Sequence, residues 1–273
     1  MALPLRHALL VVAVAALAVT AGCTGGTDPA TATPGNNSTT PDGPALEPMA
    51  QLDGAELTDA TSAAVESAGS YTSHTESVFS LNTSLRQSRT LTNTTTRVDL
   101  DARHGSRTTT QTVAVPTQAT NSAVVYTDGN TSYRRVNTSQ GVDYATQTGA
   151  GSQIVPVNTT AYGQNYTVLT DSFEYEANGT ATVAGTTTVR YTSTNLTDTS
   201  YFVGNSNATI SNATSTMYVD ADNVVRRASL SYTIEGTGGS SQTDLTITLT
   251  DIGSTTVEEP DWLSDAQSTE TAG

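Results

Sequence analysis

The chain has 273 residues, a formal net charge of -15 from 11 basic and 26 acidic side chains, and no lysine. A surface this acidic repels phosphate, which excludes nucleic acid as a partner. The single Cys excludes a disulfide framework. The length allows one large domain with a sizeable core. Ser and Thr together make up about 30% of the residues, which favours strands and loops over helices.

The acid excess without lysine is typical of a protein that works in concentrated salt. At about 1 M salt the Debye length falls to roughly 3 Å, so repulsion between carboxylates is screened while their hydration keeps the surface soluble. The alternative is an ordinary acidic secreted protein from low salt. The missing lysines favour the halophilic interpretation.

Residues 1–22 are predicted to be a signal peptide. Arg6 precedes an apolar run over 8–19, which is too short to cross roughly 30 Å of hydrocarbon as a permanent helix. Cys23 follows two small residues, and the stretch resembles a prokaryotic lipobox in which Thr20 stands where Leu is commonest. We therefore expect two acyl chains on Cys23 to anchor the protein, since each buried CH₂ contributes about 0.8 kcal/mol. The alternative is a plain secretory signal with an unmodified Cys.

The mature chain divides into a tether, one domain and a tail. Residues 23–49 hold the lipidated Cys and a segment rich in Thr, Pro and Gly, which has too little apolar surface to offset its chain entropy. Such a flexible segment spans roughly 28 Å, enough to lift a domain clear of lipid headgroups. A single β-rich domain is expected over 50–263, followed by a short acidic tail over 264–273.

One helix is predicted between Asp53 and Gly69. Leu57, Ala64 and Ala68 recur at helical spacing. Asp53 is a candidate N-cap, and Gly69 can end the helix in a left-handed conformation.

From Ser70 onward, alternation of apolar and polar residues predicts antiparallel strands with one buried and one wet face. Asp128-Gly129 predicts a hairpin, and further turns are expected at Asn178-Gly179 and at 220–223. The predicted fold class is mainly β with an N-terminal helix (α+β), a curved antiparallel meander sheet like a half-barrel. The clearest alternation lies in residues 173–177, 189–192 and 245–250.

Several segments together resemble a family of uncharacterised haloarchaeal secreted lipoproteins. They are the lipobox Cys, the tether, the helix leading into SYTSHTESVFSLN, the hairpin VVYTDGNTSYRRV, the strand pair MYVDADNVVRRASLSYTIEG and the closing LTDIGSTTVEEPDWL. More distantly they resemble LolA-like half-barrel carriers and related mycobacterial lipoproteins. That resemblance implies a curved sheet with helices on its concave side, whose inner face binds lipid. The chain departs from it by being poor in Phe and Trp.

No set of catalytic residues is recognisable, and we expect a protein that is not an enzyme and has no cofactor or metal. His74 and His104 lie in polar, strand-like stretches without a neighbouring Cys. Asp220 and Asp222 suggest a calcium loop, but the residues that follow do not fit one, so turn chemistry explains them better. Glu174 and Glu176 are the charged half of an alternation and point to one wet face.

Two double arginines stand out in a chain with few bases. Adjacent strand residues point to opposite faces, so one member of each pair can face inward and hold an anionic headgroup. The alternative is cross-strand pairing with the plentiful acids. The candidate residues are Arg134, Arg135, Arg226 and Arg227.

Twelve of the fifteen asparagines begin an Asn-x-Ser/Thr sequence, where chance alone predicts about four or five. Glycosylation of a surface protein explains this excess, and bulky sugars also shield strand edges. The possible N-glycosylation sites are Asn36, Asn37, Asn82, Asn93, Asn130, Asn137, Asn158, Asn165, Asn178, Asn195, Asn207 and Asn212.

The sequence thus predicts a lipoprotein anchored at the extracellular face of the cytoplasmic membrane. Its domain would be a binding module for a lipid or other apolar ligand. The alternative is a glycosylated structural or interaction component of the envelope, whose sheet is filled by its own side chains. A hydrolase is disfavoured because no catalytic set assembles.

Overall fold

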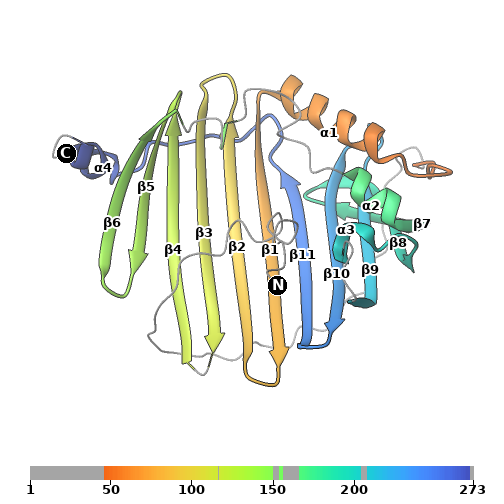
Figure 1. Cartoon of the computed structure of the whole chain (residues 1–273). Coiled ribbons are helices and arrows are strands. Elements are labelled where there is room, and N and C mark those ends of the chain that lie inside the picture. Colours follow the sequence, from red (N-terminus) through yellow and green to blue (C-terminus); the bar gives the residue numbers. More distant parts are fainter. Residues whose placement is uncertain (1–45, 116, 150–153, 156–165, 204–207, 271–273) are drawn as a thin grey trace, which may run out of the picture.

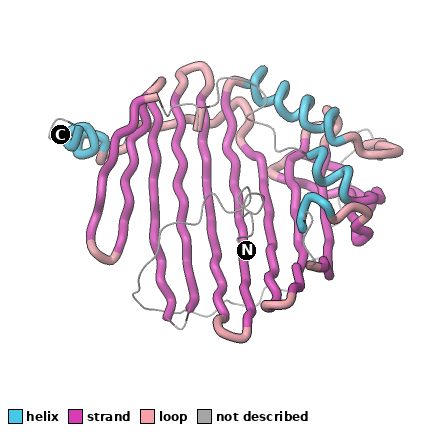
Figure 2. The backbone as a smooth tube through the Cα atoms, viewed as in Figure 1, coloured by secondary structure: helices cyan, strands magenta, loops and turns pink. Residues whose placement is uncertain are grey.

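The computed structural model describes residues 46–115, 117–149, 154–155, 166–203 and 208–270, and most of this part is strand (Figure 1; Figure 2). The predicted signal peptide, Cys23 and most of the tether lie outside the described residues. The helices are α1 (Gly54–Ala68), α2 (Tyr166–Ser172), α3 (Ser200–Val203) and α4 (Leu263–Glu270). The strands are β1 (Ser70–Thr83), β2 (Gln87–Asp99), β3 (His104–Val115), β4 (Thr117–Asp128), β5 (Thr131–Thr138), β6 (Gly141–Thr148), β7 (Phe173–Val183), β8 (Thr186–Leu196), β9 (Thr209–Val219), β10 (Val225–Gly236) and β11 (Gly239–Thr250).

These strands form one antiparallel sheet with the order β6-β5-β4-β3-β2-β1-β11-β10-β9-β8-β7. The chain builds it as two meanders, β1 to β6 and β7 to β11, which join where β11 pairs with β1. The two outer strands, β6 and β7, do not pair with each other, so the curved sheet stays open. The predicted fold class, a mainly β chain with a curved antiparallel meander sheet, is confirmed.

Helix α1 is confirmed together with both of its caps. The Asp53 carboxylate accepts hydrogen bonds from the backbone N–H groups of Ala55 and Glu56 at 2.8 and 3.1 Å, which satisfies donors that the first helical turn leaves open. Gly69 ends the helix with φ of 72°, a conformation that costs a residue without a side chain little.

The sheet has two chemically distinct faces, set by its register. The face that carries the odd-numbered residues of β1, from Tyr71 to Leu81, is called the helix face because α1, α2 and α3 pack on it. The opposite face carries the even-numbered residues of β1. It is called the strap face because the segment after β11 crosses it, starting with a hydrogen bond of 2.8 Å between the hydroxyls of Thr72 and Thr255.

Two hydrophobic clusters attach α1 to the helix face. Leu57 packs among residues of β8, β9 and β10, and Val65 packs with Tyr71, Val98 and Leu249. Ile154 and Val155 join the second cluster above Gly105, where any side chain would collide with them. The clusters therefore cover the end of the helix face that lies nearest to α1 (Figure 1).

The C-terminal segment is ordered by a third cluster on the strap face. Trp262, Leu263 and Ala266 are buried against Tyr126, with further aromatic side chains of β5 and β6 around them. Residues 264–270 thus belong to α4, where the sequence suggests only an acidic tail. The apolar residues fall at positions i, i+1 and i+4, which is the spacing of one helical face.

The turn predicted at Asn178-Gly179 is wrong. Strand β7 continues through these residues to Val183, with a register shift between Ala177 and Thr180. Gly179 has φ of 74°, so the same conformational freedom that suits a tight turn here accommodates a bulge. The predicted turns at Asp128-Gly129 and 220–223 are confirmed, since β4 ends at Asp128 and β9 ends at Val219.

Replacing Gly54 with Ala is expected to destabilise the protein, although Ala normally stabilises a helix. A Cβ at Gly54 would collide with the Thr167 Cα and the Thr170 hydroxyl of α2. The backbone atom cannot yield easily, so overpacking of about 1–3 kcal/mol should exceed the propensity gain of about 1 kcal/mol. Urea unfolding measures the change, and Ser67→Ala at an exposed position of α1 is the control. An unchanged midpoint for Gly54→Ala would contradict the close α1–α2 contact.

None of the described helices combines the length and the apolar character that a membrane crossing requires.

Candidate ligand-binding face

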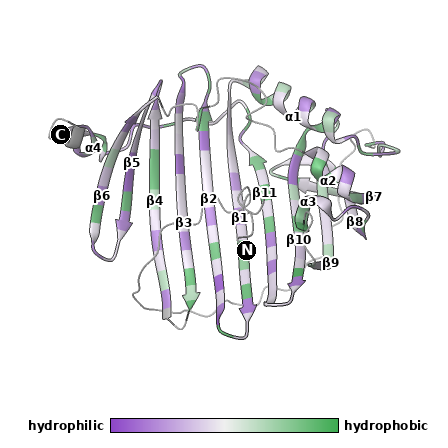
Figure 3. Ribbon diagram, viewed as in Figure 1, coloured by the Kyte–Doolittle hydropathy of each residue, from purple (hydrophilic) through white to green (hydrophobic). Residues whose placement is uncertain are grey.

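Apolar side chains gather on the helix face where β10, β11 and β1 lie side by side. Phe79 and Leu81 of β1, Leu245 of β11 and Leu230 of β10 all point to this face in the strand register. The alternating bands along these strands are visible in Figure 3. None of these residues belongs to the three clusters of the described core, and Phe79 is 39% exposed. We call Phe79, Leu81, Leu230, Leu245, Ile247 and Ile234 the apolar patch.

Aromatic rings border the apolar patch on the side of β7 to β10. Phe202 of α3 lies 5.1 Å, between ring centroids, from Tyr232 of β10, and it also contacts Phe173. The Tyr175 hydroxyl donates a 2.6 Å hydrogen bond to the Ser215 hydroxyl on the helix face. Burial raises the pKa of Tyr175 to about 12 and also raises that of Tyr232, so both rings stay neutral at physiological pH.

On the other side, the patch borders a row of hydroxyl groups and then cationic residues. Strand β2 presents Thr90, Thr92, Thr94 and Thr96 to the helix face. Beyond it, β3 carries Arg107 and β5 carries Arg134 on the same face. The helix face therefore changes from apolar to hydroxyl-lined to cationic across the sheet.

An open hollow of about 980 Å³ lies where β1 to β4 turn, at the end of the sheet away from α1. Leu85 at its rim is 96% exposed. Its volume is that of an open surface region rather than an enclosed cavity. It is lined by Ser80, Leu81, Asn82, Leu85, Arg86, Gln87, Ser88, Arg89, Ala114, Val115 and Gln118.

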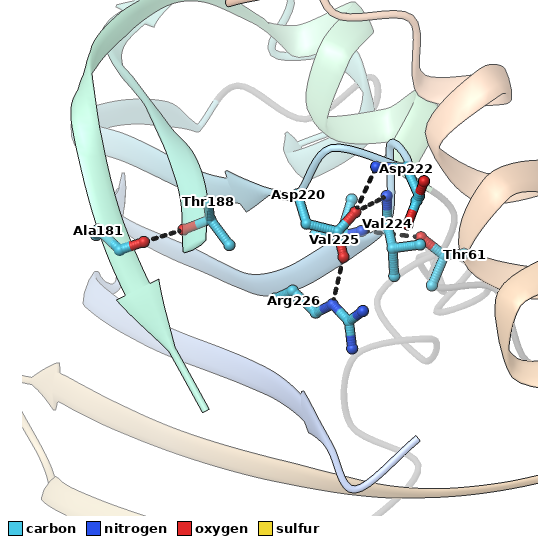
Figure 4. A network of polar contacts seen from close by, with 8 residues as sticks. All are labelled: Thr61, Ala181, Thr188, Asp220, Asp222, Val224, Val225 and Arg226. Carbon is cyan, nitrogen blue, oxygen red and sulfur yellow. Dashed lines mark hydrogen bonds and ion pairs between the residues drawn. The ribbon is translucent and has the colours of Figure 1, made fainter. Parts of the chain in front are cut away.

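Arg226 forms an ion pair with Asp220 (Figure 4). Its Nε donates to Asp220 Oδ2 at 2.6 Å, and the Asp220 side chain is only 4% exposed. The other oxygen, Oδ1, accepts from the backbone N–H groups of Asp222 and Val224, both at 3.0 Å. Arg226 therefore pairs with a carboxylate, which is the interpretation that stood as the alternative to a headgroup contact. Asp220 in turn holds the backbone of the 220–223 turn.

The other three arginines occupy different surroundings. Arg134 is exposed on the helix face, whereas Arg135 points to the strap face, where its buried Nε has no hydrogen-bond partner in the described structure. Arg227 also lies on the strap face. Its Nε donates to the Thr248 hydroxyl at 3.1 Å, and its guanidinium carbon lies 5.9 Å from the Tyr218 ring centre. Of these three, Arg134 alone faces the same side as the apolar patch.

All seven candidate glycosylation sites that the structure describes are exposed, whereas Asn121, which starts no such sequence, is buried. Asn82, Asn93 and Asn137 sit in regular register and point to the strap face. Asn195 uses its amide nitrogen in a 2.6 Å hydrogen bond to Glu174. Asn36, Asn37, Asn158, Asn165 and Asn207 lie outside the described residues.

The histidines lie at the surface and are not joined to a catalytic arrangement in the described part of the chain. His74 contacts the Thr95 hydroxyl at 3.2 Å, and His104 lies 3.3 Å from Asp128, whose side chain is 60% exposed. Among described residues, no group of three or more His, Cys, Asp or Glu is placed to hold a metal ion.

Sequence reasoning missed Arg107 and the apolar patch. Arg107 is the only charged side chain between residues 105 and 127, a signal that could have marked it. The patch depends on β1 lying between β2 and β11. The pairing of β1 with β11 joins distant parts of the sequence and leaves no local pattern.

Solved structures with a similar arrangement are known from bacterial proteins. LprF from Mycobacterium bovis shares 13% identity, with 76% of this chain and 96% of that chain covered and a TM-score of 0.41. The lipoprotein LppX of Mycobacterium tuberculosis shares 12% identity over 76% and 99% of the two chains, with a TM-score of 0.37. A LolA superfamily protein from Nitrosomonas europaea shares 7% identity over 78% and 97%, with a TM-score of 0.23. At these values, what the neighbours do remains a property of those proteins alone.

No curated protein matches the chain. A family model does match, and it extends over residues 8–266, from the apolar start of the chain to α4. The chain therefore belongs to DUF7537, a family of unknown function.

Proposed function

We propose that the protein is a lipoprotein anchored outside the cytoplasmic membrane and that its helix face binds a lipid or another apolar ligand. The observation that carries this proposal is the apolar patch. Its residues lie on the face that carries the helices, yet they belong to none of the described core clusters. Partly exposed apolar side chains gathered on one face of a sheet are typical of a binding surface.

The order of elements supports the same proposal. Helices α1, α2 and α3 all pack on the helix face, while the strap face is crossed by the C-terminal segment. The aromatic rings of α3 and β10 form one side of the patch and can contact an apolar ligand along its length. Strands provide a rigid support for such a surface, so little ordering entropy opposes binding.

The anchoring and the location rest on the sequence. A lipid on Cys23 and a tether of roughly 28 Å would leave the domain close to the membrane but free to turn. Sugars on exposed asparagines of the strap face would leave the helix face accessible, and molar salt would screen the acidic surface. Cys23→Ser should release the protein from the membrane fraction, and retention of this variant would contradict the anchor.

The test of ligand binding compares two leucines on opposite faces. Leu245 of β11 lies in the apolar patch, and Leu91 of β2 points to the strap face, and both are half-buried. The probe is the methyl ester of cis-parinaric acid, an uncharged fluorescent lipid. Leu245→Asp should weaken its binding at least tenfold, because a carboxylate in the patch must lose water to contact it. Leu91→Asp should leave binding unchanged.

Thermal unfolding of both variants shows whether either one has lost its fold. No binding of the ester by the wild-type protein, together with no lipid in an organic extract of protein purified from its own membrane, would contradict the proposal. That result would favour the alternative, an envelope component whose helix face is filled by its own chain.

A further inference from the structure

Charge is distributed unevenly between the two faces of the sheet. Among the described strand positions in regular register, the helix face carries Arg107, Arg134 and, on the outer strand β6, the exposed Asp143. The strap face carries bases and also several acids, among them Glu76, Asp244 and Glu235. The whole chain has 26 acids and 11 bases. Two arginines against one carboxylate at these strand positions are therefore unexpected from composition and favour an anionic ligand.

Arg107 is the half-buried base of the helix face, whereas Arg134 is exposed. Arg107 lies beside the cluster that contains Val98 and Val125, and its Nε donates to the Thr96 hydroxyl at 3.4 Å. Burial lowers the pKa of Arg107, which means that its surroundings solvate the charge poorly, while Tyr71 opposes this effect. Because a guanidinium stays charged in proteins, a bound anion would relieve this poor solvation.

Arg134 lies in the same cross-strand row as Arg107. Arg107 pairs with Val125, and Val125 pairs with Arg134, so the two arginines are two strands apart in one row. At about 4.8 Å per strand their backbones are about 10 Å apart, within reach of two long side chains converging on one headgroup. Across the strands, β1 also lies about 10 Å from β3. Along the strands, the row of Arg107 meets β1 at Ser73, so Ile247, which pairs with Thr75, is offset by about 7 Å and Phe79 by about 20 Å, distances that a long acyl chain spans.

From this arrangement we infer that the ligand of the helix face is an anionic amphiphile, whose apolar chain lies on the patch and whose anionic headgroup is held by Arg107 and Arg134. The inference rests on the proposed function and narrows its ligand class. The hydroxyl row of β2 lies between the two parts, where it can contact the polar region next to the headgroup.

The test compares cis-parinaric acid with its methyl ester, two probes that differ in a single charge. The wild-type protein should bind the acid at least tenfold more tightly than the ester. Arg107→Gln should reduce that preference about tenfold while leaving the affinity for the ester unchanged, and Arg134→Gln should reduce it by less. Arg97→Gln is the matched control, because Arg97 is exposed on the strap face of the neighbouring strand.

Two further measurements keep the outcome clear. Arg107→Lys retains the charge and should give an intermediate preference, which guards against loss of the fold in Arg107→Gln. Inorganic phosphate, at the concentration of the acid, should not displace it, since phosphate has no apolar chain. Displacement would indicate a site for free anions and overturn the inference.

Equal binding of acid and ester by the wild type, or an unchanged preference in Arg107→Gln, would overturn the anionic headgroup and leave the proposed apolar binding intact. Failure of both probes to bind, together with no lipid in the organic extract, would instead contradict the proposed function itself.

Discussion

Asp220→Ala is expected to lower the free energy of unfolding by about 3–5 kcal/mol, because it removes one partner of a buried ion pair. The Asp220 and Arg226 side chains are 4% and 19% exposed. The same carboxylate accepts from two backbone N–H groups of the turn, so the variant loses these bonds as well.

This turn also connects the sheet to α1. Val224 and Val225 belong to different clusters, and the Val225 N–H donates to the Thr61 hydroxyl at 3.1 Å. Next to them, the Asn223 amide donates to Glu56 at 2.8 Å. Loss of the Asp220 carboxylate should therefore loosen both clusters together, and the effect should persist in molar salt, which screens buried pairs much less than exposed ones.

Asp222→Ala is the matched control, since Asp222 is exposed in the same turn and only its backbone N–H bonds to Asp220. It should change the stability by less than about 0.5 kcal/mol. Urea unfolding in potassium chloride measures both variants. A loss below about 1 kcal/mol for Asp220→Ala would show that the ion pair does not stabilise the fold.

Leu57→Ala should cost a similar amount, about 2–5 kcal/mol, by leaving a cavity between α1 and the sheet. Leu57 is fully buried in the cluster that contains Tyr191 and Met217. Leu85→Ala makes the same chemical change at a residue that is 96% exposed, so it should be nearly neutral. Comparing the two unfolding midpoints separates the effect of losing a buried side chain from the effect of the Leu→Ala change itself. Equal midpoints would contradict the packing of α1 on the sheet.

Helix ends and turns could be predicted from the sequence where a single residue or pair of residues determines the local backbone conformation. Asp53 and Gly69 define α1 because each caps one end through its own side chain or conformation. Asp128-Gly129 likewise determines the β4–β5 hairpin. The turn prediction at Asn178-Gly179 was wrong because a bulge and a turn both need a residue with positive φ. Only the pairing with the partner strand decides between the two.

The candidate site was less predictable because it is made by pairing rather than by local sequence. The double arginines were visible, and adjacent residues do point to opposite faces, as Arg134 and Arg135 show. Their different surroundings depend on the strap that covers the far face of β4 to β6. In the same way, Phe79 and Leu245 become neighbours only when β11 returns beside β1.

Photolabelling tests the ligand-binding face most directly. A fatty acid that carries a diazirine near the end of its chain is bound to the full-length protein and irradiated, and the labelled residues are located by mass spectrometry. Binding on the helix face predicts label on β1, β10 and β11 at the positions of Phe79, Leu230 and Leu245. Label confined to the strap face, or spread evenly over both faces, would contradict it.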